Sequence, residues 1–238
     1  MRLFNILIGA AFVTAATIST ALTANLQVRP VLIDVVAPGA ASKLTLSNNG
    51  RESVNAQIRI FKWSQRKGKD ILTPTRAVVA SPPFVKMKPG GDYKLRIVRV
   101  SKKPVKGEES YRIIVDQIPN IKKKSGIAVK FNIRYSIPVF FSQSGVTPPD
   151  ISWSLKPGSR NYTLTAKNTG GSRLRVSNLR LKPKSGRAKI ISPGLAGYVL
   201  ANSSKIWKQP GRIRKARGGV IVHLTGNNKN VRSKARIR

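Results

Sequence analysis

The segment SGIAVKFNIRYSIPVFF, residues 125–141, constrains the fold of this chain more than any other part of the sequence. Apolar side chains occupy every second position from Ile127 to Phe141, and polar or small residues lie between most of them. Because successive side chains of a strand point to opposite faces, the pattern predicts a β-strand with one apolar face. Strands usually have about 5 or 6 residues, and this one could extend to roughly 15. Either it crosses two packing layers, or part of it is free to bind a partner.

The rest of the chain also reads as strands. Segments such as SKLTLSNNG, DYKLRIVRV, NYTLTAKNTGG and GGVIVHLTG show alternation or β-branched residues and are bounded by Gly, Pro or Asn. The stretch LQVRPVLIDVVAPG, residues 26–39, is treated as one further strand. No stretch of ten residues has a helical period with caps. We therefore predict an all-β chain.

The length of 238 residues favours two domains. Ser, Gly and Pro cluster in SQSGVTPPDISW, between two sets of predicted strands, as is typical of a boundary that few contacts cross. We expect domains at residues 25–145 and 146–238, each a β-sandwich. Two sandwiches in series are the predicted architecture.

The first 24 residues have the composition of an export signal. Arg2 precedes an apolar run, and small residues follow toward Ala21 and Ala24. Threonines and a serine interrupt the run before it reaches about 20 apolar residues, which argues against the alternative of a membrane anchor. An exported protein can form disulfides, but the chain contains no cysteine. Packing alone must then stabilise both domains.

The net charge of +37 is the largest compositional signal. A field of this size attracts nucleic acids, anionic lipid surfaces and acidic proteins, although it can also be a solvated coat that adds solubility. The basic residues are spread along the chain, and few aromatic residues accompany them as stacking platforms. We expect no nucleic-acid partner, but a secreted β-sandwich protein that binds polyanions remains an alternative.

Residues for catalysis or metal binding are scarce. There is no cysteine, and the one histidine, His223, lies on an apolar segment and is read as structural. The adjacent Glu108 and Glu109 follow Gly107 and are predicted to lie in a turn before a strand; if they were on a strand, they would face opposite sides and could not share a proton. No ligand or triad spacing is visible. The sequence predicts no enzyme, no metal site and no cofactor.

Several segments together carry a resemblance to a known family. The order LTLSNNG, FKWSQ, ASPPFVKMKPGGDYKLRIVRV, ESYRIIVDQIPN and finally RYSIPVFF, over about residues 25–145, resembles the amino-terminal domain of periplasmic chaperones of the chaperone-usher pathway. RYSIPVFF is most similar to the archaic branch. The second half is similar only through TAKNTGGSRLRVSNL. The resemblance implies two immunoglobulin-like domains in a boomerang arrangement, with a subunit-binding cleft between them.

The resemblance also implies a use for the long strand. In this family the last strand of the first domain, here residues 127–141, lends alternating apolar residues to an incomplete pilus subunit, a form of β-strand addition that includes donor-strand complementation. We expect Val129, Phe131 and Ile133 to fill the subunit groove, with Ile127 extending them. The alternative is that these side chains pack into the protein's own sandwich, as we expect for Val139 and Phe141.

The family anchors the subunit's terminal carboxylate with two basic residues. Arg29 occupies the position of the first. Pro138 stands where many members have a lysine, and Arg134, four residues earlier on the same face, is a possible replacement, or anchoring differs altogether. The implied protein is a non-enzymatic periplasmic chaperone whose partners are pilus or fimbrial subunits and an outer-membrane usher, with self-association through the donor strand also possible.

Overall fold

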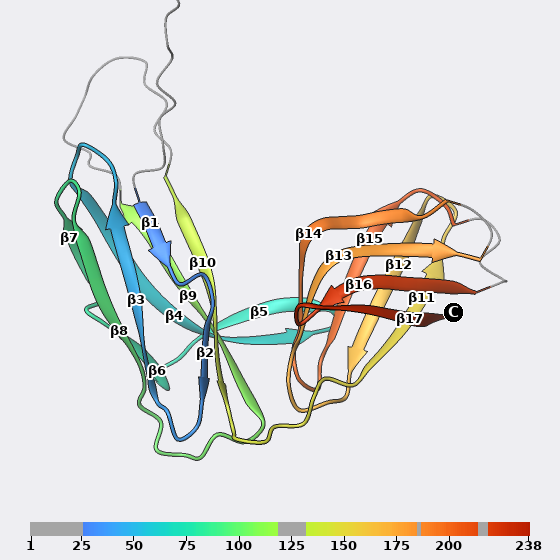
Figure 1. Ribbon diagram of the computed structural model, residues 1–238, viewed down its shortest axis with the longest axis horizontal. Coiled ribbons are helices and arrows are strands. Elements are labelled where there is room, and N and C mark those ends of the chain that lie inside the picture. The colour runs from blue at the N-terminus through green and yellow to red at the C-terminus, as the bar shows by residue number, and fades with distance from the viewer. Residues whose placement is uncertain (1–25, 119–131, 185–186, 214–218) are drawn as a thin grey trace, which may run out of the picture.

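The computed structural model describes residues 26–118, 132–184, 187–213 and 219–238, and every regular element in them is a β-strand. The all-β prediction is confirmed. The strands form two bodies that meet at an angle, and the chain crosses from one to the other after β10 (Figure 1). This described part contains no helix that could span a membrane.

Ten strands build the first body as two sheets. The first sheet has the order β1-β3-β8-β6, and the second has the order β2-β10-β9-β4-β5, with β7 also pairing with β4. The strands are β1 Leu26–Arg29, β2 Ile33–Val36, β3 Ala41–Asn48, β4 Val54–Arg66, β5 Lys69–Pro74, β6 Val78–Ser81, β7 Phe84–Met87, β8 Asp92–Arg99, β9 Glu108–Ile118 and β10 Arg134–Ser142.

The core of the first body lies between these sheets. Alternate residues of β3 and β9, among them Leu44 and Ile113, are inaccessible to solvent. Val139 and Phe141 of β10 are also fully buried there, as predicted. The period-2 pattern thus identified the core face of each strand.

The predicted strand over residues 26–39 is in fact two strands in different sheets. β1 pairs antiparallel with β3, whereas β2 pairs parallel with β10. Buried positions change parity between them, from Leu26 and Val28 to Ile33. Pro30, which has no backbone donor, lies at this break. The chain therefore crosses from one sheet to the other within a few residues.

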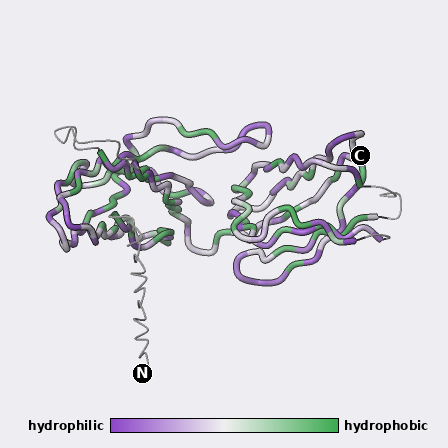
Figure 2. Tube along the Cα trace, turned by 90° about the horizontal axis from the view of Figure 1, so that it is seen from above, coloured by the Kyte–Doolittle hydropathy of each residue, from purple (hydrophilic) through white to green (hydrophobic). Residues whose placement is uncertain are grey.

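Seven strands build the second body as one sheet, in the order β14-β13-β16-β17-β11-β12-β15. The end strands β14 and β15 contact one another, so the sheet wraps around a second core that includes Trp153, Leu164 and Val222. In Figure 2, hydrophobic and hydrophilic residues follow one another at short intervals along both bodies. The strands are β11 Ile151–Pro157, β12 Asn161–Asn168, β13 Leu174–Pro183, β14 Lys189–Val199, β15 Ser204–Pro210, β16 Val220–Gly226 and β17 Lys229–Ile237.

The β4–β5 hairpin reaches from the first body to the second (Figure 1). Its turn places Lys67 and Gly68 at φ 51° and 77°, the left-handed conformation that two-residue hairpin turns use. A Cβ atom on Gly68 would lie 2.3 Å from Cγ1 of Ile206 in β15. Glycine is therefore needed here both for the turn and for the close approach of the two domains.

Candidate functional site

The strand β10 has one open edge. It pairs with β9 along its whole length, but with β2 only from Val139 to Ser142. On the β2 side, residues 134–138 have no strand partner among the described residues. Unpaired N–H and C=O groups of an edge strand are a template for an added strand. This segment of β10 can accept a strand from another molecule.

A second open edge lies beside the first. β1 is the end strand of its sheet and pairs only with β3 in the described part of the chain. The hydroxyl of Tyr135 in β10 donates a hydrogen bond to the backbone carbonyl of Leu26 in β1. The two edges are thus held near each other without forming a ladder, as Figure 1 shows for the labelled strands.

The predicted donor residues lie at the start of this edge. Ile133 immediately precedes β10, is half-buried, and its carbonyl accepts a hydrogen bond of 3.0 Å from the backbone N–H of Gln117. Ile127, Val129 and Phe131 lie outside the described residues. The apolar side of the strand continues into the core through Ile137.

The opposite side of β10 is polar only as far as Ser136. Pro138 and Phe140 are buried, and Phe140 packs with Trp63 of β4 and with Tyr198 and Leu200 of the second domain. The centroid of the Trp63 ring lies 5.9 Å from that of Phe140 and 5.6 Å from that of Tyr198. The end of β10 is therefore buried on both sides, by the core and by the domain junction.

The two basic residues expected to anchor a carboxylate differ in their surroundings. Arg29 ends β1, is exposed, and donates to the side-chain oxygen of Gln27 at 3.1 Å. Arg134 is 65% exposed and forms an ion pair with Asp116, which Arg59 also contacts at 2.6 Å. The charge of Arg134 is already matched, whereas Arg29 has no carboxylate partner in the described residues.

Arg112 is a cation that the sequence reasoning missed. It lies on β9 directly opposite Pro138, with its guanidinium 3.8 Å from the centroid of the Trp63 ring. Its Nη1 donates to the backbone carbonyl of Ser136 at 3.2 Å. Burial lowers the pKa of Arg112, but a guanidinium stays protonated at physiological pH. No motif could have indicated it, because only the register of β9 against β10 brings it beside Pro138.

Arg112 carries positive charge without a direct ion pair. None of the ion pairs of the described residues includes it. Its contacts are the rings of Trp63 and Tyr198 and one carbonyl oxygen, which leave guanidinium donors for an added acceptor. A carboxylate that enters beside β10 can pair with the positive charge of Arg112 and accept hydrogen bonds from its remaining N–H donors.

A charged cluster joins the two domains next to this site. Arg173, which precedes β13, forms ion pairs with Glu108 of β9 and Asp34 of β2. Its guanidinium also lies 3.7 Å from the centroid of the Phe140 ring. The side chain of Glu108 is 1% exposed, and this burial raises its pKa even though Arg173 opposes the shift.

The side-chain amide of Gln65 makes a second junction. Its Nε2 donates to the carbonyl of Tyr198 at 2.8 Å, and its Oε1 accepts from the backbone N–H of Leu200 at 3.0 Å. Nearby, Lys205 of β15 pairs with Asp70 of β5 at 2.6 Å. Together with the Arg173 cluster, these contacts fix the angle between the domains.

The adjacent carboxylates of Glu108 and Glu109 do not face each other. The prediction of a turn was wrong, because β9 begins at Glu108, and on this strand Glu108 points to Arg173 and Glu109 to Arg99, on opposite sides. No group of three or more His, Cys, Asp or Glu side chains in the described ranges could hold a metal ion. His223, which was read as a structural residue, lies half-exposed on the outer side of β16.

Comparison with known proteins decides the family. The model for the N-terminal domain of pili and flagellar-assembly chaperones, PapD type, matches residues 25–147. The chain belongs to this family of pilus-assembly chaperones. Chaperones of the chaperone-usher class are periplasmic, and they are not enzymes. A search of curated proteins gave no significant match.

Solved structures of this class share the fold. One is from the CsuC–CsuE chaperone–tip adhesion subunit pre-assembly complex of the archaic Csu pili of Acinetobacter baumannii, at 27% identity and a TM-score of 0.68, covering 90% of this chain and 100% of that one. Another is the Escherichia coli chaperone DraB, at 18% identity and a TM-score of 0.60, with 90% of this chain and 96% of that one covered. A third is from the complex of the Salmonella enterica SafA pilin with the SafB chaperone. It has 15% identity and a TM-score of 0.61, with 87% of this chain and 92% of that one covered. The predicted fold, with two immunoglobulin-like domains, is confirmed.

Proposed function

We propose that this chain is a periplasmic chaperone that binds pilus subunits by donor-strand complementation and delivers them to an outer-membrane usher. The observation that carries the proposal is the open edge of β10, in a domain that belongs to the pilus-chaperone family. Residues 1–24 act as the export signal, residues 25–145 form the donor domain, and residues 146–238 form the second domain.

The donor strand acts through alternate side chains. Ile127, Val129, Phe131 and Ile133 fill the groove of a subunit that lacks its last strand, while the backbone pairs with the open edges of that groove. Burial of one such apolar side chain stabilises a complex by about 1.5 to 3 kcal/mol, so four supply several kcal/mol before ordering costs. The subunit is thereby protected from aggregation through its edges.

The terminal carboxylate of the subunit binds Arg29 and Arg112. Arg112 replaces the lysine that Pro138 has displaced, from the neighbouring strand and at the same level of the sheet. A guanidinium fork can hold a carboxylate through two parallel hydrogen bonds. Arg134 does not bind the carboxylate, because it already forms an ion pair with Asp116.

The donor-strand assignment is tested by replacing Phe131 and Ile133 together with aspartate. We expect the variant to be exported and folded, but to recover less than about a tenth of the subunit that the wild type recovers, because two charges would enter an apolar groove. Co-purification of a tagged chaperone with its subunit, in about 0.5 M salt to screen exposed charge pairs, measures this. Substitution of Ala128 and Asn132 by aspartate is the matched control on the other side of the strand. Equal recovery by both variants would contradict the assignment.

The carboxylate site is tested by replacing Arg112 with glutamine. A lost hydrogen bond between charged groups costs about 1.5 to 3 kcal/mol, so we expect roughly ten- to a hundredfold weaker subunit binding. Arg134→Gln, which removes the same charge from the paired arginine, should change binding by less than about threefold. Titration of a purified subunit's C-terminal peptide by calorimetry compares the two. Weak binding by Arg134→Gln alone would instead assign the site to Arg134.

A further inference from the structure

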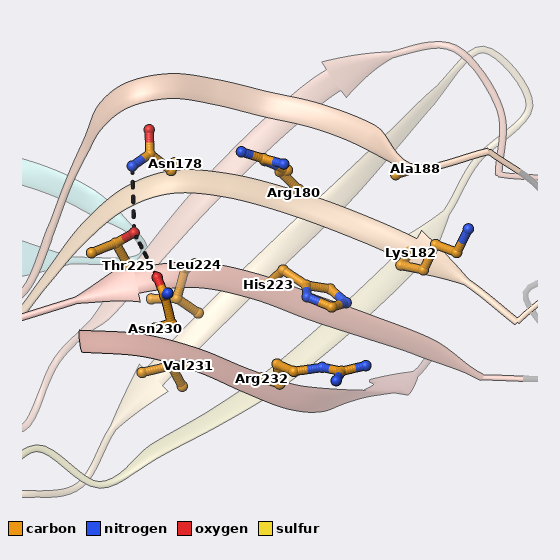
Figure 3. A pocket seen from close by; sticks show the side chains of 10 residues that line it. All are labelled: Asn178, Arg180, Lys182, Ala188, His223, Leu224, Thr225, Asn230, Val231 and Arg232. Carbon is orange, nitrogen blue, oxygen red and sulfur yellow. Dashed lines mark hydrogen bonds between the residues drawn. The ribbon is translucent and has the colours of Figure 1, made fainter. Parts of the chain in front are cut away.

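The outer side of the second domain carries a regular array of cations. Arg180 of β13 lies opposite His223 of β16, which lies opposite Arg232 of β17. In the next row, Lys182 and Lys234 flank Ile221 in the same way. Figure 3 shows Arg180, His223 and Arg232 on three neighbouring strands, pointing to one side. We call the outer side of β13, β16 and β17, with Arg180, Lys182, Arg232, Lys234 and Arg236, the basic face.

The array is two-dimensional. Neighbouring strands lie about 4.8 Å apart, and side chains on one side of a strand repeat about every 7 Å. The cations of β13 and β17 are thus roughly 10 Å apart across β16, and the rows follow one another along the strands. A hollow of about 650 Å³ between them is lined by Arg180, His223 and Arg232, with Asn178, Thr225 and Asn230 at one end (Figure 3).

The positive charge of this face is not balanced within the domain. Residues 146–238 contain one acidic side chain, Asp150, and its carboxylate accepts a hydrogen bond of 2.7 Å from the Thr169 hydroxyl. Arg180, Arg232, Lys234 and Arg236 form no ion pair with any described residue. Uncompensated cations gathered on one side of a domain form an attractive field for an anionic partner.

Two features favour a lipid surface over a nucleic acid. The aromatic residues of the second domain, Trp153, Tyr162, Tyr198 and Trp207, are all at least 92% buried, so the domain offers no stacking platform for single-stranded bases. Apolar side chains instead lie beside the cations. Ile190 of the end strand β14 pairs with Arg180 and is 64% exposed, and Leu195 on the same strand is 56% exposed.

We propose that the basic face binds an anionic phospholipid surface. The cations contact headgroup phosphates, and Ile190 and Leu195 rest at the boundary between headgroups and acyl chains, as amphipathic surface binders do. Each Lys or Arg near such a surface strengthens binding by roughly fivefold. Five cations give an attachment that holds the chaperone at the membrane while it carries a subunit, and that salt weakens.

The test is co-sedimentation of the purified protein with vesicles of phosphatidylglycerol and phosphatidylcholine, against vesicles of phosphatidylcholine alone. The variant Arg180→Gln/Arg232→Gln/Lys234→Gln/Arg236→Gln removes four cations of the face. The matched control, Arg51→Gln/Arg76→Gln/Lys88→Gln/Lys102→Gln, removes four exposed cations of the first domain. A third variant replaces the two arginines Arg180 and Arg232 by lysine, which keeps the charge.

We expect the wild type to bind only the anionic vesicles, with roughly 600-fold weaker binding in the face variant, about fivefold for each of the four cations removed, and less than about fivefold weaker binding in the control and lysine variants. Thermal unfolding confirms that each variant is folded. Equal losses in the face and control variants would show that net charge alone attracts the protein and would overturn the proposal. Absent vesicle binding, with duplex DNA bound through the same four residues, would overturn it in favour of a nucleic-acid surface.

Discussion

Replacement of Arg173 by methionine is expected to lower the free energy of unfolding by about 3 to 5 kcal/mol at pH 7.5. Methionine keeps apolar contact with the Phe140 ring but leaves the carboxylate of Glu108, whose side chain is 1% exposed, without its partner. Unpaired buried charge is costly, so the loss exceeds that of an exposed ion pair. Urea unfolding followed by tryptophan fluorescence measures it, because Trp63 lies in the same junction.

The loss should depend on pH. Burial already raises the pKa of Glu108, and removal of Arg173 raises it further. An acid whose folded-state pKa is raised binds more protons in the native state, so the variant gains stability as the pH falls toward 5. The deficit against the wild type therefore shrinks well before ordinary carboxylates titrate. Arg175→Met removes the hydrogen bond from Arg175 of β13 to Asn228, in the turn between β16 and β17, and should cost less than about 1 kcal/mol at every pH. An Arg173 variant as stable as this control would show that the cluster does not join the domains.

The second large effect is expected for Glu109→Gln. Arg99 is 7% exposed, and its Nε and Nη2 donate to the two carboxylate oxygens of Glu109 at 2.9 and 2.8 Å. Glutamine would leave the guanidinium with its two carbonyl partners, those of Ser101 and Lys103, but without a counter charge. We expect the first domain to lose about 2 to 4 kcal/mol of stability, at the lower end for a broken buried pair because those two hydrogen bonds remain.

The stability loss of Glu109→Gln should depend on pH over a different range from that of the Arg173 variant. The hydrogen bonds from Arg99 hold the pKa of Glu109 below its usual value of 4.5, despite the opposing effect of burial. Stability from a depressed carboxylate pKa is fully present above 4.5 and is lost as the pH falls toward the folded-state pKa. The deficit of Glu109→Gln should thus stay constant from about pH 8 to 5.5 and shrink only below about 4.5. Asp116→Asn, which breaks contacts with the exposed Arg59 and Arg134, is the matched control and should cost about 1 kcal/mol or less. A deficit that disappears near pH 6 would indicate that the pair is not the cause.

The two neighbouring glutamates illustrate how much the sequence could predict. The sequence predicted a turn for them, whereas β9 begins at Glu108, but it did predict that on a strand their side chains would lie on opposite sides, because period 2 is a local property of the backbone. Their partners were not predictable. Arg173 is 65 residues away from Glu108 and 139 residues away from Asp34, and nothing in a local pattern encodes such a pairing.

The same division holds along β10. The alternation of residues 125–141 predicted a strand with one apolar face, and it placed Val139 and Phe141 in the core. It did not predict that Phe140, on the other parity, would be buried as well, since that burial comes from Tyr198 and Leu200 of another domain. Nor did it show that, on the β2 side, residues 134–138 have no strand partner among the described residues, or that the register of β9 places Arg112 beside Pro138.

The sequence by itself determined the β class, the core face of the strands and the resemblance to pilus chaperones, because backbone alternation and short motifs are local. The tertiary structure decided which strand edges lack a partner strand among the described residues, which of the described cations lack an ion pair, and how the two domains contact each other. Those features depend on strand register and on contacts between residues far apart in the chain, and hydrophobic burial, which is not directional, does not specify them.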